Sequence, residues 1–354
     1  MNDSTFDYII VGAGTAGCLL ANRLSADASK RVLLIEAGKR DDYHWIHIPV
    51  GYLYCIGNPR TDWLYQTEAA DGLNGRSLRY PRGKVLGGCS SINGMIYMRG
   101  QARDFDQWAQ FTGSDDWRWD SCLPYFKAHE DHYKGATDLH GAKGIKPTLF
   151  DNPHALPESA DYFKVLKYRQ AGGEWRIEKQ RLSWGVLDAF SQAAQQAGIP
   201  ATDDFNQGNN EGVGYFEVNQ KSGWRWNTAK AFIRPACYAR PNFELWSSAQ
   251  VSKLVINTDA DGKQHCTGVE VWTGQEHITV TAKHSVVLSA GAIGTPQILQ
   301  LSGLGPAELL KQHGIEPVID LPGVGANLQD HLQIRSVFKV QGVDTLNTLA
   351  SSWW

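Results

Sequence analysis

The pattern of apolar and polar positions is clearest at the start of the chain. Residues 8–11 form an unbroken apolar run, which is typical of a strand buried on both faces. Residues 18–24 then have apolar positions at helical spacing, and a second strand pattern at residues 31–35 ends in Glu36. This order of strand, glycine turn, helix, strand and acidic residue predicts a parallel βαβ unit of the dinucleotide-binding kind.

Three glycines with the spacing G-x-G-x-x-G follow the first apolar run. In a dinucleotide-binding unit, Gly12 allows the tight turn, Gly14 lets a pyrophosphate approach the backbone, and Gly17 lets the helix pack on its strand. The N-terminus of the helix favours the phosphates. Glu36 is expected to accept hydrogen bonds from ribose hydroxyls and to repel a 2′-phosphate. The motif predicts a dinucleotide site and leaves NAD and FAD both open.

Two later regions also have strand patterns. Residues 243–256 and 268–272 alternate between apolar and polar positions, which is typical of a β-meander. Residues 285–290 form another buried apolar strand that leads into a turn at Gly291. The chain is therefore predicted to be an α/β protein with a parallel sheet and a β-meander.

The region from residue 104 to residue 132 is rich in aromatic residues and ends in the sequence His-Glu-Asp-His. Aromatic residues at helical spacing usually belong to a core, so Phe105, Trp108 and Trp117 are interpreted as core residues. The two imidazoles at residues 129 and 132 suggest a metal pair. Because no third ligand follows at a zinc-site spacing, a solvated helix face and no metal site are expected instead.

The composition is that of an ordinary globular protein. Its 354 residues, 42% hydrophobic and 20% charged with a net charge of -3, are enough for about two domains. No Lys/Arg cluster suggests nucleic acid or an anionic membrane surface as a partner. Six scattered cysteines argue against a disulfide framework, and no apolar run approaches the ~20 residues of a membrane span. Because the first strand begins near Phe6, no signal peptide is expected, and a cytoplasmic location is predicted.

A second glycine-rich stretch, residues 83–94, contains a glycine pair and a serine pair. Such small residues leave backbone N–H groups uncovered, so the stretch can approach a diphosphate or a flat ring closely. Together with the first glycine motif and Glu36, this stretch and residues 291–305 and 322–331 resemble the glucose-methanol-choline (GMC) family of FAD-dependent oxidoreductases. The four motifs occur in the family's order, and the resemblance is closest to bacterial choline dehydrogenase-like and alcohol dehydrogenase-like members.

The resemblance implies a discontinuous, Rossmann-like FAD-binding domain formed by residues 1–142 and 226–331. Residues 172–225 and 332–354 are then part of an incomplete α+β substrate-binding domain. Residues 143–171 are interpreted as an inserted surface loop, because relatives lack them and their three prolines disfavour one long helix. The candidate FAD-binding residues are Gly12, Gly14, Thr15, Ala16, Gly17, Glu36, Ala37, Val85, Gly87, Gly88, Asn93, Gly94, Met95, Ile96, Val251, Ala290 and Gly291.

The resemblance also bears on how the cofactor is held. Some relatives attach FAD covalently through a histidine just before the asparagine that matches Asn93. Here Ile92 occupies that position, so FAD is predicted to bind non-covalently.

The implied reaction is oxidation of a primary alcohol or a choline-like substrate by hydride transfer to the flavin, with the electron acceptor left open. The family's catalytic histidine lies in a C-terminal segment, and no catalytic residue is expected within this chain. His331 belongs to the Asn-Leu-Gln-Asp-His motif and is a poor substitute. The chain is thus interpreted as the N-terminal portion of a truncated enzyme. The alternatives are a non-catalytic FAD-binding remnant, a flavin-containing lyase of the same family and an NAD-dependent dehydrogenase.

Overall fold

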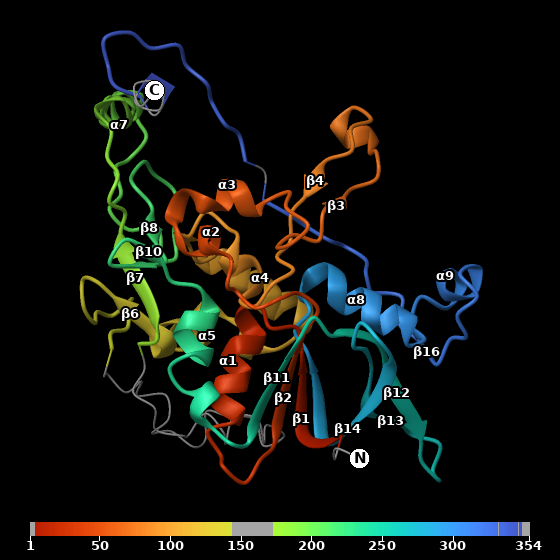
Figure 1. The fold of residues 1–354 in the computed structure, drawn as a ribbon. Helices are drawn as coiled ribbons and strands as arrows, with labels where there is room; N and C mark the ends of the chain where they lie inside the picture. Colours follow the sequence, from red (N-terminus) through yellow and green to blue (C-terminus); the bar gives the residue numbers. More distant parts are fainter. Residues whose placement is uncertain (1–3, 144–172, 332, 346, 349–354) are drawn as a thin grey trace. The chain divides into compact units, whose positions relative to one another are not determined.

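The computed structural model describes residues 4–143, 173–331, 333–345 and 347–348 (Figure 1). These residues form two compact units. The first unit contains the described residues of 1–94 and 224–329, and the second contains those of 95–153, 170–223 and 330–354. Apart from Lys143, the segment interpreted as an inserted loop lies outside the described residues.

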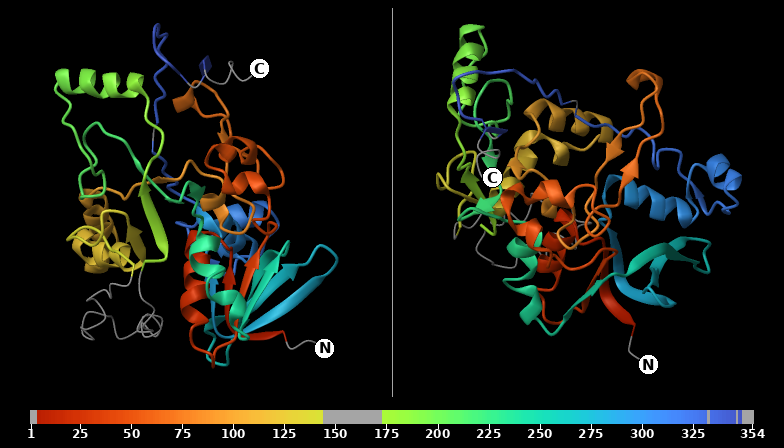
Figure 2. Two further views of the ribbon diagram at one scale, coloured as in Figure 1. Left: turned by 60° about the vertical axis from the view of Figure 1, so that its left-hand side comes forward. Right: turned by 45° about the horizontal axis from the view of Figure 1, so that its top comes forward.

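A six-stranded sheet with the strand order β11-β2-β1-β14-β13-β12 forms the framework of the first unit (Figures 1 and 2). The strands β11, β2, β1 and β14 run parallel, while β13 and β12 continue the sheet in antiparallel fashion. The strands are β1 (Thr5–Val11), β2 (Val32–Glu36), β11 (Phe243–Ser247), β12 (Gln250–Thr258), β13 (Gln264–Trp272) and β14 (His277–Leu288). The predicted α/β class with a parallel sheet is confirmed.

The meander is shorter than the sequence predicts. Residues 243–247 were expected to belong to it, but β11 pairs in parallel with β2, with Phe243 opposite Val32. Only β12, β13 and β14 form the antiparallel meander. The chain turns between β11 and β12 at Ser248, whose φ is 57°. Apolar alternation alone does not distinguish a parallel edge strand from a meander strand, which explains this error.

One apolar core unites the sheet with helix α8 (Gly291–Leu301). All five residues of β2 are buried, as expected for a strand covered on both faces. The core residues are Phe6, Ile9, Val11, Leu33, Ile35, Ala249, Val251, Leu254, Val269, Val271, Val280, Ile298 and Leu304. Helix α1 (Thr15–Leu24) packs beside the short helix η6 (Ala229–Ile233), and the side-chain amide of Asn22 donates to the carbonyl of Phe232 at 2.6 Å.

Short elements complete the first unit. They are α2 (His44–His47), η1 (Pro49–Gly51), α3 (Tyr52–Cys55), β3 (Tyr65–Gln66), η2 (Asp71–Leu73), β4 (Arg79–Tyr80), η3 (Gly88–Ser91), β10 (Trp224–Arg225), η7 (Cys237–Ala239), β15 (Leu304–Gly305), α9 (Ala307–Gln312) and β16 (Ile319–Asp320).

The second unit is built on a four-stranded sheet with the order β5-β8-β7-β6. Its elements are β5 (Ile96–Tyr97), α4 (Ala102–Thr112), η4 (Asp115–Trp117), α5 (Trp119–His129), β6 (Glu130–His132), β7 (Trp175–Lys179), α7 (Gly185–Gln196), β8 (Glu217–Val218) and β9 (Gln220–Lys221). Because β5 and β6 pair within this sheet, residues 95–142 fall in this unit rather than with the six-stranded sheet. The predicted FAD-binding domain included them, and the division into functional domains stays a prediction.

Two expectations about residues 104–132 are wrong. The predicted solvated helix face is strand β6, in which Glu130 is 0% and His132 is 2% exposed. This strand pairs in parallel with β7, far along the sequence, so local periodicity does not reveal it. Among the aromatic residues, Phe105 is buried, but Trp108 and Trp117 are 50% and 46% exposed and are not core residues.

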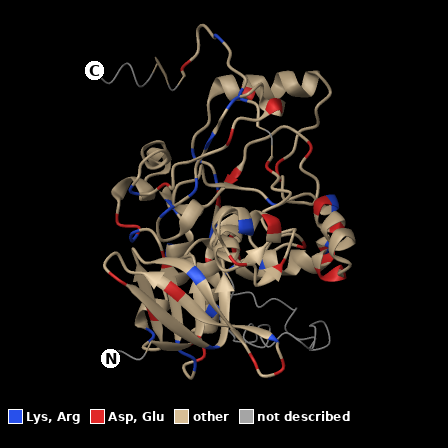
Figure 3. Cartoon of the chain, turned by 90° about the vertical axis from the view of Figure 1, so that its right-hand side faces the viewer, with Lys and Arg blue, Asp and Glu red and all other residues tan. Residues whose placement is uncertain are grey.

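Charged residues of both signs are interspersed along the described chain (Figure 3). None of the helices in the described ranges combines the length and the apolar character needed to cross a membrane.

Candidate functional site

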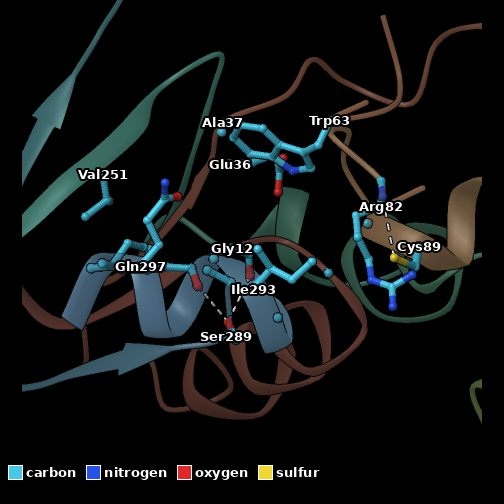
Figure 4. Close-up of a pocket in the computed structure, with 18 of the residues that line it drawn as sticks. Gly12, Glu36, Ala37, Trp63, Arg82, Cys89, Val251, Ser289, Ile293 and Gln297 are labelled. Carbon is cyan, nitrogen blue, oxygen red and sulfur yellow. Dashed lines mark hydrogen bonds between the residues drawn. The ribbon is translucent and has the colours of Figure 1, made fainter. Parts of the chain in front are cut away.

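The first unit contains a pocket of about 330 Å³ where β1, β2 and β14 end (Figure 4). The crevice outside the carboxyl ends of parallel strands is the usual ligand position in α/β sheets. Its lining comes from five parts of the chain, namely residues 11–16, residues 35–37, several residues between 63 and 89, residues 249–251 and several residues between 289 and 298.

The three glycines of the first motif have different structural roles. A Cβ on Gly12, whose φ is 95°, would lie 2.6 Å from the carbonyl oxygen of Ser289, and one on Gly17 would lie 1.9 Å from the carbonyl oxygen of Gly12. Close packing within the protein therefore requires both glycines. A Cβ on Gly14 would meet nothing within 4 Å, and Gly14 lines the pocket. Gly14 thus leaves space that the protein itself does not use.

Two helices begin at this pocket. Helix α1 follows Gly14 and helix α8 follows Ala290, and neither N-terminus has a side-chain cap. The first N–H groups of a helix have no acceptor within the helix, and they lie at the positive end of its dipole. The first residues of both helices line the pocket, which therefore suits an anionic group such as a diphosphate.

Glu36 lies at the end of β2 and ties two turns together. Its carboxylate accepts hydrogen bonds from the backbone N–H of Ala13 at 2.9 Å and from that of Gly38 at 2.8 Å. Burial raises the pKa of Glu36 to about 7, although both N–H donors and Lys84 act in the opposite direction. Each carboxylate oxygen has a second lone pair, so Glu36 can also accept hydroxyl donors from a ligand in the pocket.

The second glycine stretch packs directly against the first. The N–H of Gly87 donates to the carbonyl of Ala13 at 2.8 Å. A Cβ on Gly88 would lie 2.7 Å from the Cα of Gly14, so only glycine permits this contact. The structure thus brings the two predicted glycine motifs together at one pocket.

Aromatic and cationic side chains form another wall of the pocket. The rings of Trp63 and Tyr65 are stacked, with centroids 5.7 Å apart and an interplanar angle of 3°. Lys84 Nζ lies 4.4 Å from the centre of the Trp63 ring. Arg82 and Cys89 also line the pocket, and Cys89 Sγ accepts a hydrogen bond from the N–H of Gly83 at 3.4 Å.

The second unit contains a largely buried cluster of ionisable side chains, which we call the buried ionic network: Arg99, Glu130, His132, His140, Asp204 and Glu217. Glu130 pairs with the guanidinium of Arg99 and, at 3.1 Å, with His140 Nδ1. His140 Nε2 lies 2.9 Å from Asp204. Burial opposes protonation of His140, but hydrogen bonds to Asp204 and Glu130 outweigh it and raise the pKa of His140 to about 9. Burial alone would raise the pKa of Glu130, but hydrogen bonds from His140 and Arg99 outweigh it and lower this pKa to about 2.

The geometry of this network does not suit a metal ion. Ligand atoms of His132, His140 and Glu217 lie within 4.8 Å of one another. However, the two imidazole rings are stacked at 3.8 Å with an interplanar angle of 19°. The lone pairs of imidazole nitrogens lie in the ring plane, so stacked rings do not direct them at one ion. Both nitrogens of His140 already face carboxylates.

Comparison with known proteins agrees with the geometry of the pocket. Residues 6–333 match the GMC oxidoreductase family. The chain belongs to this family. The prediction of GMC membership is therefore confirmed, and so is the prediction of FAD as the cofactor. Gly14, the two helix N-termini and Glu36 fit an FAD dinucleotide, because they offer open space, anion-binding N–H groups and a hydroxyl acceptor.

Several curated relatives are dehydrogenases. The chain is 38% identical to oxygen-dependent choline dehydrogenase of Photobacterium profundum, over 98% of this chain and 55% of the relative. It is 40% identical to alcohol dehydrogenase [acceptor] of Pseudomonas putida, over 93% of this chain and 54% of the relative. Pyridoxine 4-oxidase from Mesorbium loti has a similar structure, with a TM-score of 0.76 and 33% identity over 90% of this chain and 55% of that one. The chain spans about half the length of the curated relatives it matches.

The structure brings many of the candidate GMC site residues together. Those that line the pocket are Gly12, Gly14, Thr15, Ala16, Glu36, Ala37, Gly88, Val251, Ala290 and Gly291. Gly17, Val85 and Gly87 are buried and do not line it, whereas Asn93 and Gly94 are exposed at the end of the second glycine stretch. Met95 and Ile96 belong to the second unit. The assignment of these residues to FAD stays a prediction.

Some residues of the GMC pocket were not foreseen from the sequence. Trp63 and Tyr65 are not among the candidate site residues, although the spacing Trp-x-Tyr is compatible with two rings on one side of an extended chain. Ser289 was also missed. Its hydroxyl donates to the carbonyl of Gly12 at 2.9 Å and lies 3.0 Å from that of Val11, which joins the ends of β14 and β1.

Proposed function

We propose that this chain binds FAD non-covalently in the pocket and forms the FAD-binding part of an alcohol-oxidising enzyme. The observation that carries the proposal is the convergence of two uncapped helix N-termini, the open space at Gly14 and the buried Glu36 on one pocket. This arrangement matches the charges and hydroxyl groups of a dinucleotide.

The residues have separate roles in this proposal. The N-termini of α1 and α8 would hold the diphosphate, Glu36 would accept hydrogen bonds from the ribose hydroxyl groups, and Val251 would lie on the adenine side of the pocket. Bound FAD supplies a ring system that accepts a hydride from the substrate. Ile92, which is 3% exposed, has no nucleophilic atom with which to form a covalent link.

The proposed reaction is oxidation of the CH–OH group of a primary alcohol or a choline-like substrate. The names of the relatives, choline dehydrogenase and alcohol dehydrogenase [acceptor], support this substrate class. A base must take the hydroxyl proton. We assign none among the described residues, whose two buried histidines, His132 and His140, are held by carboxylates in the buried ionic network. The electron acceptor is left open, and the cytoplasmic location stays a prediction.

A titration of the flavin-free chain with FAD tests the binding proposal. We expect saturable quenching of flavin fluorescence, and a parallel titration with NAD should compete weakly, because this family uses FAD. Acid precipitation of the loaded protein should release all the yellow colour into the supernatant. Colour retained on the polypeptide would contradict non-covalent binding, and no quenching would contradict the site itself.

The reaction is tested separately. Anaerobic addition of choline or primary alcohols to the FAD-loaded chain reports whether the flavin is reduced. Bleaching that requires the α-hydrogens of the alcohol would support the oxidation. No bleaching in loaded protein would limit the proposal for this chain to FAD binding.

A further inference from the structure

Arg225, at the end of β10, is a buried cation without a counter-ion in the described structure. Its side chain is 0% exposed, and no carboxylate of the described residues forms an ion pair with it. Nε donates to the carbonyl of Ile46 at 2.7 Å, and Nη1 donates to the carbonyl of Ser90 at 3.1 Å and to Asn93 Oδ1 at 2.9 Å. Nη2 is buried and has no hydrogen-bond partner among the described residues.

The surroundings of Arg225 do not neutralise it. Burial lowers the pKa of Arg225 to about 10, so the guanidinium remains charged near neutral pH. Lys230, a second cation, donates to the backbone carbonyl of Arg225 at 2.9 Å. Asp41, the carboxylate that acts on Lys230, is already paired with Arg234 at 2.7 Å and accepts a hydrogen bond from Asn227 at 2.9 Å. The positive charge of this region therefore exceeds its negative charge.

A purely structural role does not require this charge. Neutral donors such as the side-chain amide of glutamine can bond to backbone carbonyls without the desolvation penalty of a buried ion. Arg225 instead places a cation under the turn that begins at Ser90 and ends at Asn93, a candidate FAD residue. An uncompensated buried charge acts strongly on a nearby ligand because the local dielectric constant is low.

We propose that Arg225 is a positioning residue for the flavin, which fixes the turn from Ser90 to Asn93 and favours the reduced, negatively charged flavin by its uncompensated charge. The flavin gains that negative charge when a hydride passes to it from the alcohol carbon. The inference rests on the proposed binding of FAD and extends it to a residue outside the pocket lining.

Two substitutions separate the two parts of this role. Arg225→Gln keeps hydrogen-bond donors but removes the charge, whereas Arg225→Lys keeps the charge but cannot make all three bonds. Arg240→Gln is the matched control. Arg240 also bonds to carbonyl and hydroxyl groups of the first unit, at Asn22 and Ser25, but not to the turn.

Three measurements are made on the full chain. Hydrogen exchange of the amides of residues 86–94, without FAD, reports on the turn itself. The dissociation constant of FAD and the reduction potential of bound FAD report on the cofactor. For Arg225→Gln we expect the exchange rate and the FAD dissociation constant each to rise about tenfold, because hydrogen bonds from a charged donor are lost. We expect the reduction potential to become more negative, because the buried charge is lost. For Arg225→Lys we expect faster exchange with a nearly unchanged potential.

Each outcome decides one part of the inference. Unchanged exchange in both variants would overturn the positioning role, and an unchanged potential in Arg225→Gln would overturn the electrostatic role. If Arg225→Gln fails to fold, Arg225→Lys decides instead. An unchanged exchange rate in Arg225→Lys would overturn the positioning role, and a more negative potential would overturn the electrostatic role. Failure of the unaltered chain to bind FAD would overturn the proposed function and the flavin role together, and this result is distinct because it appears without any substitution.

Discussion

The pocket of the first unit and the buried ionic network of the second unit use polar groups in opposite ways. In the pocket, two helix N-termini present N–H groups that no side chain caps. In the network, the carboxylate of Glu130 meets both Arg99 and His140, and the imidazole of His140 lies between two carboxylates. The pocket therefore keeps hydrogen-bond donors free for a ligand, whereas the charged groups of the network are paired with one another.

This difference shows how to separate a binding site from a structural cluster. Strongly shifted pKa values occur in both regions, at Glu36 and at His140. At Glu36 the shift comes from burial beside an open pocket, whereas at His140 it comes from partners that already fill the space. Only the first situation leaves bonding capacity for another molecule. Substitutions in the network should therefore change stability, and substitutions in the pocket should change FAD affinity.

The largest effect is expected from Glu130→Gln. This change leaves Arg99 without its buried counter-ion and removes one of the two carboxylates that face His140. Breaking a buried ion pair costs about 3–5 kcal/mol of unfolding free energy. Urea unfolding measures the cost. In Glu308→Gln, which breaks the exposed pair with Lys311, we expect no measurable change. If Glu130→Gln lowers the unfolding free energy by less than about 1 kcal/mol, the network contributes no more to stability than an exposed salt bridge.

Two alanine substitutions in one motif sharpen the comparison. Gly17→Ala places a Cβ 1.9 Å from the carbonyl oxygen of Gly12 and should cost about 3 kcal/mol of stability through overpacking. Gly14→Ala meets no atom within 4 Å, at a φ of -78°, and should leave stability nearly unchanged. It should nevertheless weaken FAD binding about tenfold by filling the space for the diphosphate. Calorimetry of both variants, with and without FAD, checks the contrast; equal FAD affinity in Gly14→Ala and the unaltered chain would contradict it.

A smaller, pH-dependent effect is expected at Glu36. Its pKa in the folded protein, about 7, lies above the ordinary value of 4.5. The FAD-free chain should therefore lose stability as the pH rises from about 4.5 to about 7, because over this window the carboxyl group ionises in the unfolded chain but stays protonated in the folded one. FAD affinity should rise several-fold as the pH rises through about 7, since the ionised carboxylate is the better acceptor for ribose hydroxyls. Fluorescence titrations across this range measure it, with Glu36→Gln expected to show a flat profile.

The sequence revealed those features that local patterns encode. The run of residues 8–11, the glycine motif and the strand ending in Glu36 were found because the βαβ unit is continuous in sequence. Strand β6 was missed because its partner β7 is distant, and β11 was misplaced because alternation does not specify a neighbour. Trp63 escaped notice as a site residue for a similar reason. Its relation to the pocket depends on tertiary packing and not on a motif.

The pairing of β14 with β1, which is far from it in sequence, has a consequence for when the pocket can form during synthesis of the chain. The pocket needs residues 12–16, which follow β1, and residues 289–298, which lie at the start of α8, so most of the chain separates the two parts. Contacts so distant in sequence form late and slowly. During synthesis, the glycine turn therefore leaves the ribosome long before its partner helix exists. FAD should join only after residue 298 has emerged, and chains stopped earlier should remain free of the cofactor.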